Sequence, residues 1–141
     1  MKNILNKIPH LNLIWLIRYW LGAMMIYHSY WAFFDDNGLT GFAEYLVKSC
    51  FPEAYSLPLA ILSKSIEFFG GILLFFGFAT RLVSFLIILV MGIAVFYMHK
   101  GLIWGEGELA FNYLLMAIIL FFNPSIPFKI NELIKPIKNE K

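Results

Sequence analysis

Long apolar segments alternate with short polar ones along this chain, and the pattern predicts helices that span a membrane. A spanning helix needs roughly 20 predominantly apolar residues, because it rises about 1.5 Å per residue through a hydrocarbon core about 30 Å thick. The polar residues Asp35 to Gly38 end the first apolar segment sharply. The four predicted spans cover about residues 13–34, 57–78, 82–98 and 108–123.

A shorter amphipathic segment lies between the first two spans. From about residue 41 to 51, Phe42, Leu46 and Cys50 recur at every fourth position, with Glu44 and Lys48 between them. This length is too short to span a bilayer but suits a helix lying at the interface. We therefore predict an all-α fold, a transmembrane four-helix bundle with a short interfacial helix between spans one and two. Residues 1–141 would form one domain, with a charged tail at 129–141.

The composition agrees with a membrane protein and excludes several other classes. Of the 141 residues, 60% are hydrophobic and 14% are charged, whereas soluble domains carry about 25% charged residues. The net charge of +2 is too small, and the basic residues too scattered, for a nucleic-acid surface. Cys50 is the single cysteine of the chain, so neither an internal disulfide nor a dithiol redox pair forms.

The basic residues predict the orientation of the spans. Lys and Arg are enriched in cytoplasmic loops. One side of the predicted bundle carries most of the basic residues, and the other carries most of the acidic ones. We therefore expect both termini and the turn between spans two and three to face the cytoplasm. The basic residues on that side are Lys2, Lys7, Arg18, Arg81 and the tail lysines.

Several ionisable residues fall inside the apolar segments or at their ends. A charge at the centre of a bilayer costs roughly 2.5–3.5 kcal/mol on insertion scales, so it is normally paired, hydrated or used. At about 1.5 Å of rise per residue, we expect His28, Lys64 and Glu67 roughly 9, 10 and 15 Å below the outward ends of their spans, and His99 and Glu108 at those ends. We expect Arg18 to approach these five residues from the cytoplasmic side. The five residues predicted to line this outward-opening polar cavity are His28, Lys64, Glu67, His99 and Glu108.

Each of these residues has alternative interpretations. Arg18 and Glu67 are either a buried structural ion pair or direct contacts of a ligand or proton. Lys64, three residues from Glu67, is either its partner or a residue that reaches toward a neighbour or the interface. His28 and His99 are either structural, or they serve as proton relays, hydrogen-bond partners of a quinone or haem ligands. The spacing of His99, Glu106 and Glu108 matches no zinc pattern, so we predict no metal site.

Several motifs resemble the DoxX family of small four-span membrane proteins. They are Arg18 with His28 ten residues later, Glu67-Phe68-Phe69-Gly70-Gly71, Gly77-Phe78-Ala79-Thr80-Arg81, His99, and Gly107-Glu108. The resemblance covers about residues 14–128. It implies a four-helix bundle in the bacterial inner membrane. Several family members are similar to membrane subunits of redox systems, including thiosulfate:quinone oxidoreductase.

The resemblance and the polar residues together predict a quinone-interacting or membrane-anchoring subunit of a redox system. Proton handling is assigned to Glu67, His99 and Glu108, and ligand binding to Arg18, His28, Lys64, Glu67, Arg81 and Asn112. Quinone is the candidate cofactor of this redox hypothesis. No electron carrier is encoded in the chain, so flavin, haem or a thiol would have to come from a partner or substrate. The chain would then be an accessory subunit and not a complete enzyme.

Two other functions remain open from the sequence. One is a non-catalytic assembly subunit of a larger membrane complex, and the other is a small transporter or proton pathway. The expected partners are the lipid bilayer and either a redox enzyme or a larger membrane complex. A second copy of the chain is a further candidate partner, whereas nucleic acid is not expected.

Overall fold

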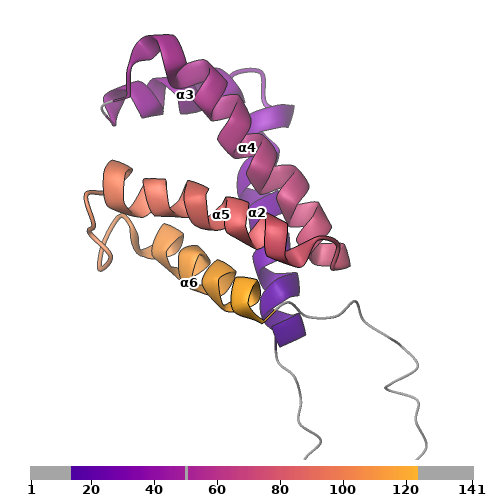
Figure 1. Cartoon of the computed structure of the whole chain (residues 1–141). Helices are drawn as coiled ribbons and strands as arrows, with labels where there is room; N and C mark the ends of the chain where they lie inside the picture. The colour runs from indigo at the N-terminus through magenta and orange to yellow at the C-terminus, as the bar shows by residue number, and fades with distance from the viewer. Residues whose placement is uncertain (1–13, 50, 124–141) are drawn as a thin grey trace, which may run out of the picture.

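Five α-helices and one π-helix make up the described part of the chain, residues 14–49 and 51–123 of a computed structural model (Figure 1). No strand occurs in these ranges, which confirms the prediction of an all-α fold. The predicted tail and Cys50 lie outside the described residues. The elements are α2 (Ile14–Phe34), α3 (Gly38–Lys48), α4 (Glu53–Phe76), α5 (Thr80–Ile93), η1 (Ala94–Met98) and α6 (Glu108–Phe122).

Two of the described helices are long and apolar enough to cross a membrane. They are α4 and the continuous helix Thr80–Met98 that α5 and η1 form together. Helix α2 has 21 residues, but Arg18, His28 and several Trp and Tyr side chains dilute its apolar character. Helix α6 is strongly apolar, but its 15 residues are too few for a full crossing. Length and composition thus support two spans, and the four-span bundle stays a prediction.

The second of the predicted spans belongs to a longer helix than the apolar pattern suggested. Helix α4 begins at Glu53, directly after Pro52, whose extended backbone precedes the first turn. Pro58 lies inside the helix, in its second turn. Proline has no backbone N–H, so α4 lacks at this position the hydrogen bond to the carbonyl of residue 54. At the other end, Gly77 closes the helix in the left-handed conformation, with φ of 78°.

Helices α2 and α4 touch through their backbones. A Cβ atom added to Gly22 would lie 2.8 Å from the Gly71 carbonyl oxygen, and one added to Gly71 would lie 2.8 Å from the Gly22 oxygen. Gly70 faces α5 instead, where an added Cβ would lie 3.0 Å from a Val83 methyl carbon. Gly70 and Gly71 therefore let neighbouring helices approach closely, as small residues do in membrane proteins.

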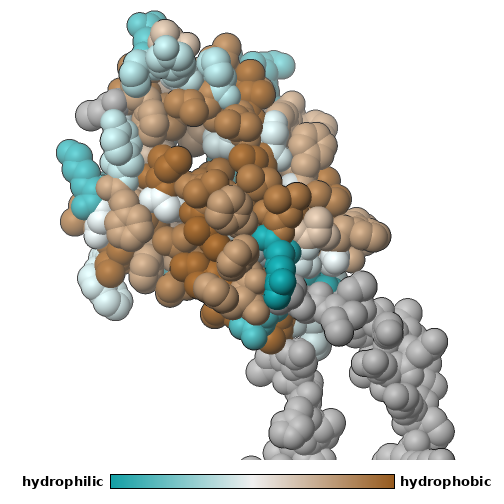
Figure 2. All heavy atoms as spheres, in the orientation of Figure 1, coloured by the Kyte–Doolittle hydropathy of each residue, from teal (hydrophilic) through white to brown (hydrophobic). Residues whose placement is uncertain are grey.

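The main core lies where α2 and the end of α4 meet the antiparallel pair α5 and α6 (Figure 1). It is built from fully apolar side chains such as Leu21, Leu74, Ile87 and Leu120. A second, smaller core joins α3 to the beginning of α4 through Leu46 and Ala60. Figure 2 shows that apolar residues cover most of the visible face, whereas polar ones gather toward its edges. This distribution suits a molecule surrounded by lipid.

Candidate functional site

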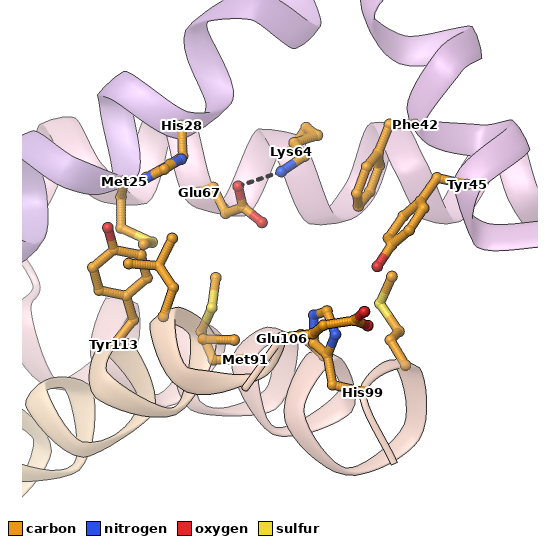
Figure 3. A pocket seen from close by; sticks show the side chains of 14 residues that line it. Met25, His28, Phe42, Tyr45, Lys64, Glu67, Met91, His99, Glu106 and Tyr113 are labelled. Atoms are coloured by element: carbon orange, nitrogen blue, oxygen red, sulfur yellow. Dashed lines mark hydrogen bonds and ion pairs between the residues drawn. The ribbon is translucent and has the colours of Figure 1, made fainter. Parts of the chain in front are cut away.

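A cavity of about 200 Å³ lies between α4 and the region where η1 leads into α6 (Figure 3). Helices α4 and α5 are close at the turn that joins them and diverge toward their other ends (Figure 1). The cavity occupies the wide end of this V. Its polar lining residues are His28, Tyr45, Lys64, Glu67, His99, Glu106 and Tyr113, and its apolar ones include Met25, Phe42, Met91 and Met98.

An ion pair forms one wall of the cavity. The Lys64 ammonium nitrogen lies 2.7 Å from the Glu67 Oε2 atom, and both side chains are largely buried, with 13% and 6% of their surfaces exposed. Residues three apart in a helix share a face, so α4 by itself brings these two groups together. The same ammonium lies 4.3 Å from the centroid of the Phe42 ring of α3, within range of a cation–π contact. Of the alternatives left open for Lys64, the structure shows the ion pair with Glu67.

Arg18 lies elsewhere, which corrects the prediction that it pairs with Glu67 at the cavity floor. Its guanidinium is packed against Gly77, so closely that a Cβ atom added to that glycine would lie 2.5 Å from Nη1. Gly77 is ten residues beyond Glu67, about 15 Å along the axis of α4. The guanidinium also lies 5.1 Å from the Tyr19 ring.

The position of Arg18 explains why its charge is tolerated in a buried place. The last carbonyl groups of a helix lack partners within the helix and carry the negative end of its dipole. A cation at the carboxyl end of α4 therefore stabilises these groups. Arg18 is almost fully buried, with 1% of its surface exposed. We interpret it as a structural residue that fixes α2 against the end of α4.

His99 and Glu106 form the opposite wall of the cavity (Figure 3). His99 directly follows the π-helix η1, and its backbone N–H donates to the Ala94 carbonyl at 2.9 Å, closing the last wide turn. The chain then reverses through Lys100 and Gly101, both with positive φ. A π-turn adds one residue to a helical turn and is frequent at functional sites. Here the wide turn and the reversal bring His99 to the cavity.

Tyr113 and Tyr45 are two lining residues that the sequence pattern did not reveal. The Tyr113 ring centroid lies 5.7 Å from that of His28, and the tyrosine is buried. Figure 3 shows its hydroxyl directed toward Met25 and His28, while the Tyr45 hydroxyl of α3 is directed across the cavity toward His99. Both residues lie in segments that the hydrophobic pattern marks as apolar or interfacial. Tyrosine is common in such segments, so no signal set these two apart.

Three other predicted site residues do not line the cavity. Glu108, Asn112 and Arg81 are exposed on the surface of the described helices. Glu108 lies in the first turn of α6, where its carboxylate interacts favourably with the positive end of the helix dipole. Glu106, two residues earlier in the loop, occupies the place in the cavity wall that was expected for Glu108.

The cavity combines groups that exchange protons with groups that donate hydrogen bonds. Two carboxylates, an ammonium, two imidazoles and two phenols surround a space whose remaining lining is apolar. Among the described residues, no group of three or more His, Cys, Asp or Glu side chains is placed to hold a metal ion. Ligand pockets commonly measure about 300–1,000 Å³. At about 200 Å³, this cavity suits the polar head group of a larger ligand.

The comparison with protein families gives one match. The family model described as DoxX matches residues 13–100, which include α2 to η1 and thus both walls of the cavity up to His99. Glu106 and Tyr113 lie beyond the matched segment. Neither the curated proteins nor the solved structures contain a match to the chain.

Proposed function

The chain belongs to the DoxX family of membrane proteins, and from this premise we propose that it is the quinone-interacting subunit of a membrane redox system. The proposal places it in a bacterial inner membrane with four spans and both termini in the cytoplasm. The cavity would then open toward the outward side. The electrons would come from a partner enzyme of the dehydrogenase class.

The observation that carries this proposal is the gathering of the paired Lys64 and Glu67 with two imidazoles and two phenols around one cavity. Reduction of a quinone to a quinol consumes two electrons and two protons at its two carbonyl oxygens. The ammonium of Lys64 and the Tyr45 hydroxyl are suited to donate hydrogen bonds to such oxygens. Glu67 and His99 are suited to hold and pass protons, because carboxylic acids and imidazoles are the usual general acids and bases.

The apolar part of the lining supports the same ligand. Met25, Met91 and Phe42 surround the polar groups with a surface that a hydrophobic ring can contact. The outer surface of the helices carries many exposed large apolar side chains, as expected for contact with lipid. A lipid-soluble ligand such as a quinone can contact these apolar side chains with its ring while its carbonyl oxygens meet the polar groups of the cavity.

Glu67→Gln tests the proposal directly. The substitution removes the carboxylate that holds the Lys64 ammonium in place as a donor to the quinone. A hydrogen bond from a charged donor is worth about 1.5–3 kcal/mol, so we expect the Kd of a short-chain ubiquinone to rise about tenfold or more. The measurement is isothermal titration calorimetry of the purified protein in mild detergent. Glu44→Gln is the matched control, because Glu44 is an exposed carboxylate on α3 outside the cavity and its substitution should leave the Kd unchanged.

Equal ubiquinone affinities for the wild type and Glu67→Gln would contradict the proposal. If the Glu67→Gln and His99→Ala variants each still bring down a large complex, and that complex contains no quinone, the chain is a structural assembly subunit. Proton or solute movement in vesicles holding the purified chain alone would identify a transporter or proton pathway. Pull-down from native membranes with mass spectrometry of proteins and lipids separates the first two cases.

A further inference from the structure

A second hollow lies on the outside of the molecule, in the groove between α4 and α5. It measures about 260 Å³ and is almost entirely apolar. Its far end is formed by Ser65 and Leu86, and its near end, at the turn between the helices, by Ala79 and Leu82. Along α4 it extends from residue 65 to residue 73, about 12 Å at 1.5 Å per residue.

The shape of this groove depends on a missing side chain. Gly70 is part of the lining, and an added Cβ at this position would lie 3.0 Å from Val83. The rims carry side chains exposed to the surroundings, such as Phe69 and Leu82. In a membrane protein, a long apolar groove open along its length meets hydrocarbon chains. One acyl chain lying lengthwise is the simplest occupant.

The near end of the groove is cationic. Arg81 is exposed, lies beside Leu82 in the first turn of α5, and makes no ion pair with any described residue. Arg18 is the other charged group at this end, since its guanidinium packs against Gly77. Among the described residues, the acidic residue nearest to this turn in the sequence is Glu67, which is about ten residues away. The electrostatic potential here therefore favours an anion.

We propose that this groove binds one phospholipid with an anionic head group, its phosphate on Arg81 and one acyl chain in the apolar groove. Arginine binds phosphate through two parallel hydrogen bonds, and Arg81 lies at the start of one of the two candidate membrane helices, beside the turn that joins them. A zwitterionic lipid offers the same acyl chain without the net negative charge. The site therefore selects by charge at one end and by shape along the rest.

Native mass spectrometry of the delipidated protein in detergent tests this site. The probes are phosphatidylglycerol and phosphatidylcholine with identical acyl chains. A basic residue near an anionic surface is worth about 1 kcal/mol, so we expect about a fivefold preference for phosphatidylglycerol. Arg81→Gln should abolish this preference. Lys48→Gln is the matched control, because Lys48 is an exposed cation on α3, far along the chain from the groove, and it should keep the preference.

A second variant tests the acyl chain separately. Ser65→Phe fills the far end of the groove and should lower the occupancy of both lipids several-fold without affecting the ratio between them. Glycerol phosphate, which has a head group but no chain, should not displace the bound phosphatidylglycerol. Displacement by glycerol phosphate would show a free-phosphate site and overturn the lipid assignment.

Two further results would overturn the proposal. One is equal occupancy by both lipids in the wild type, unchanged by Arg81→Gln, which would indicate ordinary annular lipid. The other is a lipid-free dimer that Ser65→Phe dissociates, which would show that a second copy of the chain fills the groove. Circular dichroism of each variant distinguishes loss of binding from loss of folding.

Discussion

Arg18 and Glu67 are both charged residues buried among apolar helices, yet their surroundings differ. Counted over the whole residue, 1% of the Arg18 surface and 5% of the Glu67 surface are exposed. The Arg18 guanidinium is packed against the backbone of Gly77 at the end of α4. Glu67 faces a cavity of about 200 Å³ and has the neighbouring Lys64 as its partner.

The difference between the two sites shows how a buried charge can serve structure or function. A charge packed tightly against a helix end has no room for a ligand, and its contacts can only hold the fold. A charge beside an open cavity can change its partner or its proton without moving the helices. Substitutions at the two sites should therefore separate stability from binding.

The largest effect is expected from Arg18→Ala. The change removes a long buried side chain and the cation at the end of α4, and truncations of large buried residues cost about 2–5 kcal/mol. We expect the free energy of unfolding to fall by about 3 kcal/mol, measured by circular dichroism during titration with denaturing detergent. Arg81→Ala removes an exposed arginine nearby and should cost less than about 0.5 kcal/mol. Similar losses for both variants would show that Arg18 is not the structural cation.

A smaller loss is expected from Gly77→Ala. The φ of 78° at Gly77 disfavours any residue with a Cβ by about 1–2 kcal/mol, and the new methyl group would also displace the Arg18 guanidinium. We expect a total loss of about 2–3 kcal/mol in the same titration. Gly101→Ala is the control, because Gly101 has φ of 74° but no neighbouring atom within 4 Å of an added Cβ. The two variants differ by the contact with Arg18, and equal losses would argue against it.

The smallest effect on stability is expected when the whole ion pair of the cavity is replaced. Exchange of a buried ion pair for apolar residues of similar volume is often neutral or stabilising. The double variant Lys64→Met with Glu67→Met should therefore unfold within about 1 kcal/mol of the wild type, while quinone binding is lost. Either single replacement leaves one buried charge unpaired and should cost more than the double variant. A loss of several kcal/mol in the double variant would make this ion pair structural, like Arg18.

Much of the architecture follows from local sequence patterns. Apolar segments and turn residues predicted the helices, and the three-residue spacing of Lys64 and Glu67 indicated their ion pair as one of the alternatives for Lys64. Both features depend on interactions between residues that are close to each other in the sequence. His28, Lys64, Glu67 and His99, expected around one cavity, do line the same cavity in the structure.

The errors arise where the rotation or end of a helix decides the result. Depth along a helix placed Arg18 beneath the same cavity as Glu67, but depth does not specify which neighbour a side chain meets. Glu106 lies in the loop before α6 whereas Glu108 is the first residue of the helix, so the two carboxylates have different surroundings although only two positions separate them. The π-turn before His99 adds a further rotation that no regular helical pattern contains.

The sequence by itself therefore determined the all-α class, the membrane character, the family and the closeness of Lys64 and Glu67 on one helix. Those properties depend on composition, periodicity and short spacings. The tertiary structure alone decided which buried charge faces a cavity, which carboxylate completes its far wall and where Arg18 packs. These outcomes depend on contacts between helices distant in the chain, where side-chain rotation and close backbone packing at residues such as Gly22 and Gly71 set the neighbours.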